Sequence, residues 1–152
     1  MPNDNRFHSP RDRNLSIPPG PKISSDLVKK WIQTGMDREA ISFSEEFGKY
    51  LAELEYTTSQ IRNVFGELRR IQLGGIESQV SSFHLLKAKI AYTTRKDKAP
   101  TDKQFAASGK FKELFDAAHD AVDLDNHARV HFNHFVNLME SILAYHKAHG
   151  GK

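Results

Sequence analysis

The chain has 152 residues and no cysteine, and it carries 22 basic against 19 acidic side chains, for a formal net charge of +3. This length predicts one domain that can bury its own core and excludes two domains of ordinary size. The lack of cysteine excludes disulfides, thiolate metal sites and a thiol nucleophile. No apolar run approaches the roughly 18–20 residues of a membrane-crossing helix, and the first residues lack the apolar middle of a secretion signal. We therefore expect a soluble, intracellular protein.

The first 22 residues have the composition of an unstructured tail. Few large apolar side chains are present there to offset the entropy of ordering. Residues that interrupt regular hydrogen bonding are frequent, namely Pro10, Pro18, Pro19, Gly20 and Pro21. We expect residues 1–23 to form a flexible tail, with ordering on a partner as the alternative, and residues 24–149 to form a single helical domain.

From residue 24 onward, apolar residues recur at the spacing of amphipathic helices. Ser25 is the candidate N-cap of a short first helix, which ends at Gly35. Asp37 opens a second helix. Thr57 and Gln60 have the spacing of a capping box at the start of a third.

The third helix ends at the Gly74–Gly75 pair, because glycine is the residue that most often terminates helices. A fourth helix is expected from about residue 77 to residue 95. Thr101 and Gln104 form another candidate capping box, and Gly109 divides the segment that follows.

The last helix is expected over residues 127–146, where seven apolar residues make a broad face: Phe132, Phe135, Val136, Leu138, Met139, Ile142 and Leu143. Alternating β-branched runs are missing, so no strand is predicted. The predicted fold is all-α, a compact bundle of about five to six helices with short connections that favour antiparallel neighbours.

Positive charge is concentrated in residues 57–98. This segment holds eight basic and three acidic residues, whereas the segments before and after it each carry one more acid than base. The basic residues are Arg62, Arg69, Arg70, Lys87, Lys89, Arg95, Lys96 and Lys98. Basic residues clustered in one segment of a helical protein indicate a surface that binds a polyanion.

Arg62 and Arg69 are the strongest candidates for phosphate contacts. A helix advances about 100° per residue, so these two arginines lie almost on one line, two turns apart, with Gly66 close to that line. Arginine binds phosphate through two parallel hydrogen bonds and stays charged. Glycine lets a strand approach the helix.

The remaining cations do not share that line. Arg70 is displaced away from the apolar side of its helix, and Lys87, Lys89 and Arg95 project in three directions from the next helix. A single patch then requires both helices, or a helix break near Lys87. The alternative interpretation is an ordinary solvated surface on which long side chains cover apolar neighbours.

Other chemistry finds little support in the sequence. His127, His131 and His134 are spaced so that two imidazoles can reach one metal ion, but no HExxH motif or cysteine pair accompanies them. Surface or hydrogen-bonded histidines are the favoured interpretation, and His146 is expected in the core or at an interface. P-loop, GxGxxG and GxSxG motifs are missing. We expect no enzyme activity, no cofactor, no metal and no small-molecule substrate.

The order of these signals resembles the small subunit of type III-A (Csm) CRISPR interference complexes. The similarity covers roughly residues 54–147. It is carried by residues 58–63 with Phe65 and Arg69–Arg70, residues 85–92 with Arg95, the aromatic pair Phe132 and Phe135, and residues 140–147. The chain departs from the family pattern at Ala88, where a proline is expected.

The resemblance implies a non-catalytic, all-helical subunit of a cytoplasmic prokaryotic ribonucleoprotein in antiviral defence. Several copies stack beside guide RNA and target RNA, next to the large subunit and the repeated backbone subunit. Nuclease and cyclase chemistry belongs to other subunits. RNA contact without sequence preference is then expected from Arg62, Arg69, Arg70, Lys87, Lys89 and Arg95, because base pairing supplies the specificity.

Two other functions stay open at this point. The first is a helical scaffold that docks only protein subunits, with its basic residues paired to acidic partners. The second, more remote, is a hydrolase with a histidine-bound metal.

Overall fold

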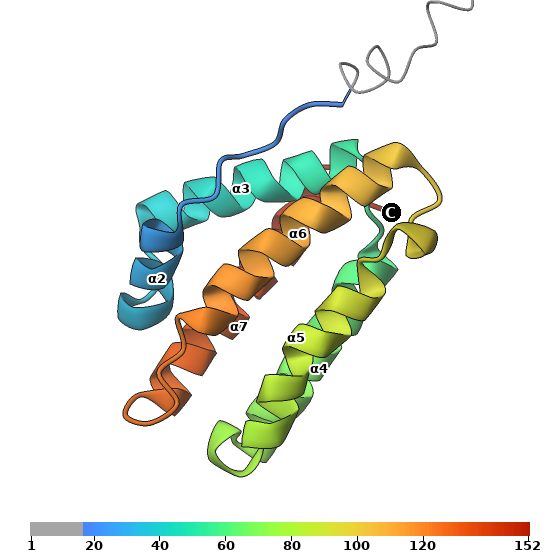
Figure 1. Ribbon diagram of the computed structural model, residues 1–152. Helices are drawn as coiled ribbons and strands as arrows, with labels where there is room; N and C mark the ends of the chain where they lie inside the picture. The colour runs from blue at the N-terminus through green and yellow to red at the C-terminus, as the bar shows by residue number, and fades with distance from the viewer. Residues whose placement is uncertain (1–16) are drawn as a thin grey trace, which may run out of the picture.

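The computed structural model describes residues 17–152, and within them it has six α-helices and no strand. Figure 1 shows their arrangement. This confirms the predicted all-α class. None of the helices in this part of the chain is long and apolar enough to span a bilayer. The α-helices are α2 (Ser25–Thr34), α3 (Arg38–Glu53), α4 (Thr58–Gly74), α5 (Val80–Thr93), α6 (Asp102–Asp120) and α7 (Ala128–Ala148), and two 3-10 turns are η2 (Ile76–Ser78) and η3 (Lys96–Lys98).

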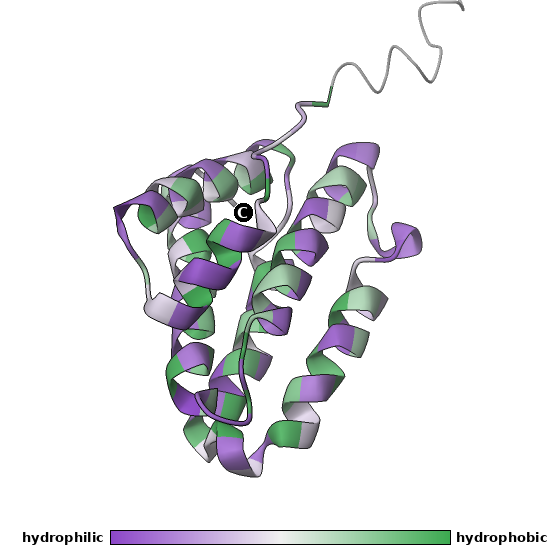
Figure 2. Cartoon of the chain, turned by 60° about the vertical axis from the view of Figure 1, so that its left-hand side comes forward, coloured by the Kyte–Doolittle hydropathy of each residue, from purple (hydrophilic) through white to green (hydrophobic). Residues whose placement is uncertain are grey.

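The long C-terminal helix α7 is the centre of the packing. Helices α2, α3 and α4 all pack against it, and α2 also contacts α6. Helix α5 lies beside α4 and also contacts α6 (Figure 1). Apolar and polar residues alternate around every helix, as Figure 2 shows. The apolar sides meet in one core that includes Trp31, Phe47, Phe115 and Phe135.

Three of the four predicted capping residues are N-caps in the structure, namely Asp37, Thr57 and Thr101. The Asp37 carboxylate accepts a hydrogen bond from Ala40 N–H at 2.8 Å, and the capping box of Thr57 and Gln60 is complete in both directions. The predicted cap at Ser25 is wrong by one position. Ser24 has the extended backbone of an N-cap, and its hydroxyl accepts from the N–H of Leu27, so Ser25 is already helical.

The second predicted capping box forms only in half. The Thr101 hydroxyl accepts a hydrogen bond from Gln104 N–H at 3.1 Å. The Gln104 side-chain amide does not reach back to Thr101, because it donates to the carbonyl oxygen of Glu55 at 2.7 Å. This glutamine therefore ties the start of α6 to the loop between α3 and α4.

Two predicted boundaries differ from the structure for local reasons. The fourth helix begins at Val80 instead of near residue 77, since η2 inserts a 3-10 turn after Gly75. It is continuous through Ala88, where the family pattern predicted proline. Gly109 does not divide α6, because its backbone stays helical.

Residues 17–24 run along the bundle and join the core at its edge. Ile17 and Ile23 are partly buried against it. Lys110 of α6 donates to the carbonyl oxygen of Pro21 at 3.3 Å, and Gly20 lies against the ring of Tyr50. The rest of the predicted tail, residues 1–16, lies outside the described residues.

Candidate nucleic-acid interface

The outward side of α4 carries the two best candidate phosphate ligands. Arg62 and Arg69 are both exposed, and the apolar side of the helix, including Ile61, Val64 and Leu68, is buried. Seven helical residues place the two arginines about 10 Å apart along the axis. A Cβ built on Gly66 between them would meet no atom within 4 Å, so the space above this position is open. We call Arg62, Gly66 and Arg69 the arginine stripe.

Neither arginine of the stripe forms an ion pair with any of residues 17–152. Arg69 Nη1 donates a hydrogen bond to Gln72 Oε1 at 2.7 Å, and its guanidinium carbon lies 6.0 Å from the centre of the Phe65 ring. Gln72 donates in turn to Asn133 of α7 at 3.0 Å. Arg69 is thus oriented by neutral neighbours and keeps most of its five N–H donors for a ligand.

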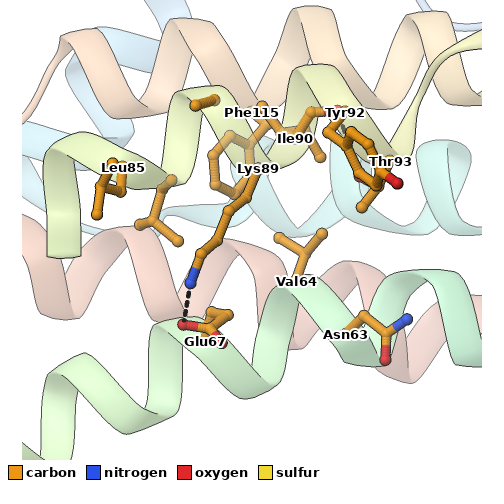
Figure 3. Close-up of a pocket in the computed structure, with 11 residues that line it drawn as sticks. Asn63, Val64, Glu67, Leu85, Lys89, Ile90, Tyr92, Thr93 and Phe115 are labelled. Atoms are coloured by element: carbon orange, nitrogen blue, oxygen red, sulfur yellow. Dashed lines mark hydrogen bonds and ion pairs between the residues drawn. The ribbon is translucent and has the colours of Figure 1, made fainter.

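Arg70 and Lys89 share one acidic partner. The Glu67 carboxylate oxygen Oε2 lies 2.9 Å from Arg70 and 3.0 Å from Lys89, so this glutamate links α4 to α5 (Figure 3). Hydrogen bonds from Arg70 and then Lys89 lower the pKa of the Glu67 carboxyl. The three side chains together carry one net positive charge.

Lys87 and Arg95 are also neutralised locally. Lys87 forms an ion pair with Asp120 of α6, whereas Lys89, two residues later, reaches toward α4. Arg95 pairs with Asp97 at 2.9 Å. The six predicted RNA ligands therefore do not converge on one patch: two form the stripe on α4, and the other four each sit beside a carboxylate.

A mainly apolar groove of about 460 Å³ separates α4 from α5 (Figure 3). Val64 and Glu67 of α4 line one wall, and Leu85, Lys89 and Tyr92 line the other. Leu85 and Tyr92 are 56% and 54% exposed. Our sequence reasoning missed this feature as a site.

A signal for the groove was present in the sequence of α5. Leu85, Ala88 and Tyr92 stand at i, i+3 and i+7, which places them on one side of a helix. The buried residues Phe83 and Ile90 occupy the opposite side. Helix α5 is therefore apolar on two sides, and only one of them enters the core.

The histidines mostly bind backbone groups. His131 Nδ1 accepts from Asp123 N–H at 3.0 Å, and His134 Nδ1 donates to the carbonyl oxygen of Ile32 at 2.6 Å. His146 is fully buried, as predicted, and its Nε2 donates to the Tyr56 carbonyl oxygen at 2.6 Å. No group of three or more potential ligands within the described residues is arranged to hold a metal ion.

Comparison with known proteins agrees with the resemblance seen in the sequence. The model of the Csm2 Type III-A family matches residues 36–152, which is most of the chain. No curated protein and no solved structure matches this chain. The matched region contains the arginine stripe, the groove and the whole of α3 to α7. The chain therefore belongs to the Csm2 Type III-A family and is a small subunit of type III-A CRISPR complexes.

Proposed function

We propose that this subunit is a non-catalytic RNA-binding protein that holds the sugar–phosphate backbone of guide or target RNA without sequence preference. The observation that carries the proposal is the arginine stripe. Arg62 and Arg69 are exposed on one line of α4, the position between them has no side chain, and neither arginine is paired with a carboxylate of residues 17–152.

The chemistry of this stripe suits phosphate better than it suits base edges. Guanidinium groups form paired, charge-assisted hydrogen bonds with phosphate oxygens. Contacts to phosphate position a nucleic acid but carry no sequence information. In an RNA-guided complex the sequence is read by base pairing, so a subunit beside the duplex needs positive charge and no base code.

The other four predicted ligands have a secondary role in this proposal. Arg70, Lys87, Lys89 and Arg95 each have a carboxylate neighbour, and all four side chains are substantially exposed. Exposed ion pairs of this kind contribute little stability. A phosphate can therefore replace the carboxylate partner at small cost, but the gain in affinity is less than for an unpaired arginine.

The proposed setting is the cytoplasm of a prokaryotic cell, in antiviral defence. The partners are guide RNA, target RNA, the large subunit, the repeated backbone subunit and neighbouring copies of this chain. No cofactor, metal or small-molecule substrate is part of the proposal, and the chemical steps belong to other subunits.

The test is the salt dependence of RNA binding by the Arg62→Ala/Arg69→Ala double variant. For single strands, log Kobs against log salt changes by about 0.7 for each phosphate contact. We expect the slope to flatten by about 1.4 and the affinity to fall similarly for RNAs of unrelated sequence.

The matched control replaces two exposed cations that have no ion pair within residues 17–152, Arg38 and Lys49 of α3, by alanine. This control should leave the slope near that of the wild type. An unchanged slope in a folded Arg62→Ala/Arg69→Ala protein would contradict the proposal.

The alternative function is a protein scaffold without RNA contact. It is favoured by one observation, the apolar side of α5 formed by Leu85, Ala88 and Tyr92, which faces the groove instead of the core. RNA crosslinking of the assembled complex separates the two functions. Crosslinks in α4 and α5 support RNA contact, and their absence from the whole chain supports the scaffold.

A further inference from the structure

We propose that Tyr92 is a stacking platform for one unpaired nucleobase, and that Arg95 and Lys98 hold the phosphates on either side of that base. The site lies at the C-terminal end of α5. The inference rests on the proposed RNA-binding function and adds to it a base contact that the arginine stripe does not provide.

The first observation is an exposed aromatic ring with two cations close to its centre. Tyr92 is 54% exposed. The guanidinium carbon of Arg95 lies 4.4 Å from the ring centre, and the ammonium nitrogen of Lys98 lies 4.9 Å from it. An aromatic ring beside cations on an open surface is the combination that binds single-stranded nucleic acids.

The second observation is the local charge. Residues 95–98 contain three cations and one acid. Asp97 pairs with Arg95 at 2.9 Å, whereas Lys96 and Lys98 form no ion pair with residues 17–152. The 3-10 turn η3 brings Lys98 back over Tyr92, so an uncompensated positive charge is held next to the ring.

The third observation is the space beside the ring. Tyr92, Thr93 and Asn63 line the same end of the groove between α4 and α5 (Figure 3). A base stacked on Tyr92 at this end lies beside the Asn63 side chain. An amide offers both donors and an acceptor, so it can meet the edge of any base. The site therefore fits a base without selecting which one.

The cations do not block this site. At an exposed position a cation–π contact is a weak interaction, and base stacking on an aromatic side chain is at least as strong. A base can therefore replace a cation on the ring. Lys98 is long and flexible, so its ammonium can move from the ring to a phosphate next to the base.

The experiment compares an ordinary single-stranded RNA with a strand of equal length whose nucleotides lack bases. Fluorescence anisotropy gives Kd for the full-length wild type, Tyr92→Phe and Tyr92→Leu. Leucine keeps an apolar side chain but has no aromatic face. We expect Tyr92→Leu to weaken binding of the ordinary strand at least about five-fold, Tyr92→Phe to resemble the wild type, and the abasic strand to bind all three proteins alike.

Lys98→Ala is the companion variant, because it removes charge and leaves the ring. It should weaken binding of both strands by a similar factor. Thermal melting of each variant confirms that it is folded, which is expected since both side chains are exposed.

The outcomes separate this inference from the proposed function. Equal Kd values for the wild type and Tyr92→Leu on the ordinary strand overturn the stacking site, and so does an equal loss on both strands. If the stacking site fails in this way but Arg62→Ala/Arg69→Ala weakens binding of both strands, the backbone-binding function stands without the stacking site. If that double variant has no effect while Tyr92→Leu acts only on the ordinary strand, the stacking site stands and the arginine stripe fails.

Discussion

Gly48 of α3 and His146 of α7 touch through their backbones. A Cβ built on Gly48 would stand 2.6 Å from the backbone nitrogen of His146 and 2.9 Å from the carbonyl oxygen of Ile142. Only a residue without a side chain allows α3 and α7 to approach this closely. Gly151 lies against the imidazole of the buried His146.

We predict that Gly48→Ala destabilises the protein by about 1–3 kcal/mol, because the backbone atoms of α7 cannot move aside as a flexible side chain can. Gly109→Ala is the matched control. This glycine is also inside a helix, and a Cβ there would meet no atom within 4 Å. Alanine should stabilise that position by about 0.5–1 kcal/mol. Urea unfolding measures both values, and a stabilising Gly48→Ala would contradict the close packing of α3 on α7.

Gly66 should behave like Gly109 in stability and unlike it in RNA binding. Both positions are open, so alanine at either should raise the free energy of unfolding by about 0.5–1 kcal/mol. Leucine at position 66 should weaken RNA binding, because it occupies the space between Arg62 and Arg69. Gly109→Leu should leave RNA affinity unchanged, and equal affinities for the two leucine variants would show that RNA does not cross α4 at this point.

Glu67→Gln should strengthen RNA binding. This carboxylate neutralises part of the charge of Arg70 and Lys89, and its removal leaves both cations for phosphate. If each gains one contact, the dependence of log Kobs on log salt steepens by about 1.4 for single strands. The cost in stability should stay at or below about 1 kcal/mol for each exposed pair. Glu113→Gln on the exposed side of α6 is the control. If the salt dependence of RNA binding has the same slope in Glu67→Gln and Glu113→Gln, Arg70 and Lys89 do not contact RNA.

Lowering the pH should reduce the free energy of unfolding, because three buried histidines resist protonation in the folded state. Burial lowers the pKa of His119, His131 and His146 below the usual value. In the range between the lowered folded pKa and about 6.5, the unfolded chain binds more protons than the folded chain, so stability falls as pH falls. Each histidine contributes at most about 1.4 kcal/mol per pH unit.

Urea unfolding between pH 7 and pH 5 measures this slope. His146→Gln should reduce the loss on acidification, because it removes one of the buried titrating groups. A stability that does not change across this range would contradict the assignment of neutral buried histidines.

The helices were predictable because their ends are encoded locally. Asp37 and Thr57 cap helices with their own side chains, and Gly75 ends α4. The predictions were wrong where two neighbouring residues compete for the same cap position, or where residues distant in the sequence determine the partner of a side chain. Ser24 and Ser25 are both suitable caps, and only one of them can have the extended backbone that a cap needs.

The candidate site was less predictable than the fold. Helical spacing correctly placed Arg62 and Arg69 on one exposed line, since both are on the same helix. The partners of Lys87 and Lys89 depend on how α5 packs against α4 and α6. Periodicity within one helix contains no information about such neighbours. Tyr92 was overlooked for a related reason, because an aromatic at helical spacing resembles a core residue until its helix is placed.

Helix α5 contributes only three side chains to the core, Phe83, Leu86 and Ile90. Its other apolar side is open, and its main neighbours are α4 and α6. Few buried contacts mean a low free energy of local opening. The amide protons of α5 should therefore exchange with solvent earlier than those of α7. Whatever ligand bridges α4 and α5 then stabilises this hairpin in particular, so occupancy of the groove and rigidity of the hairpin rise together.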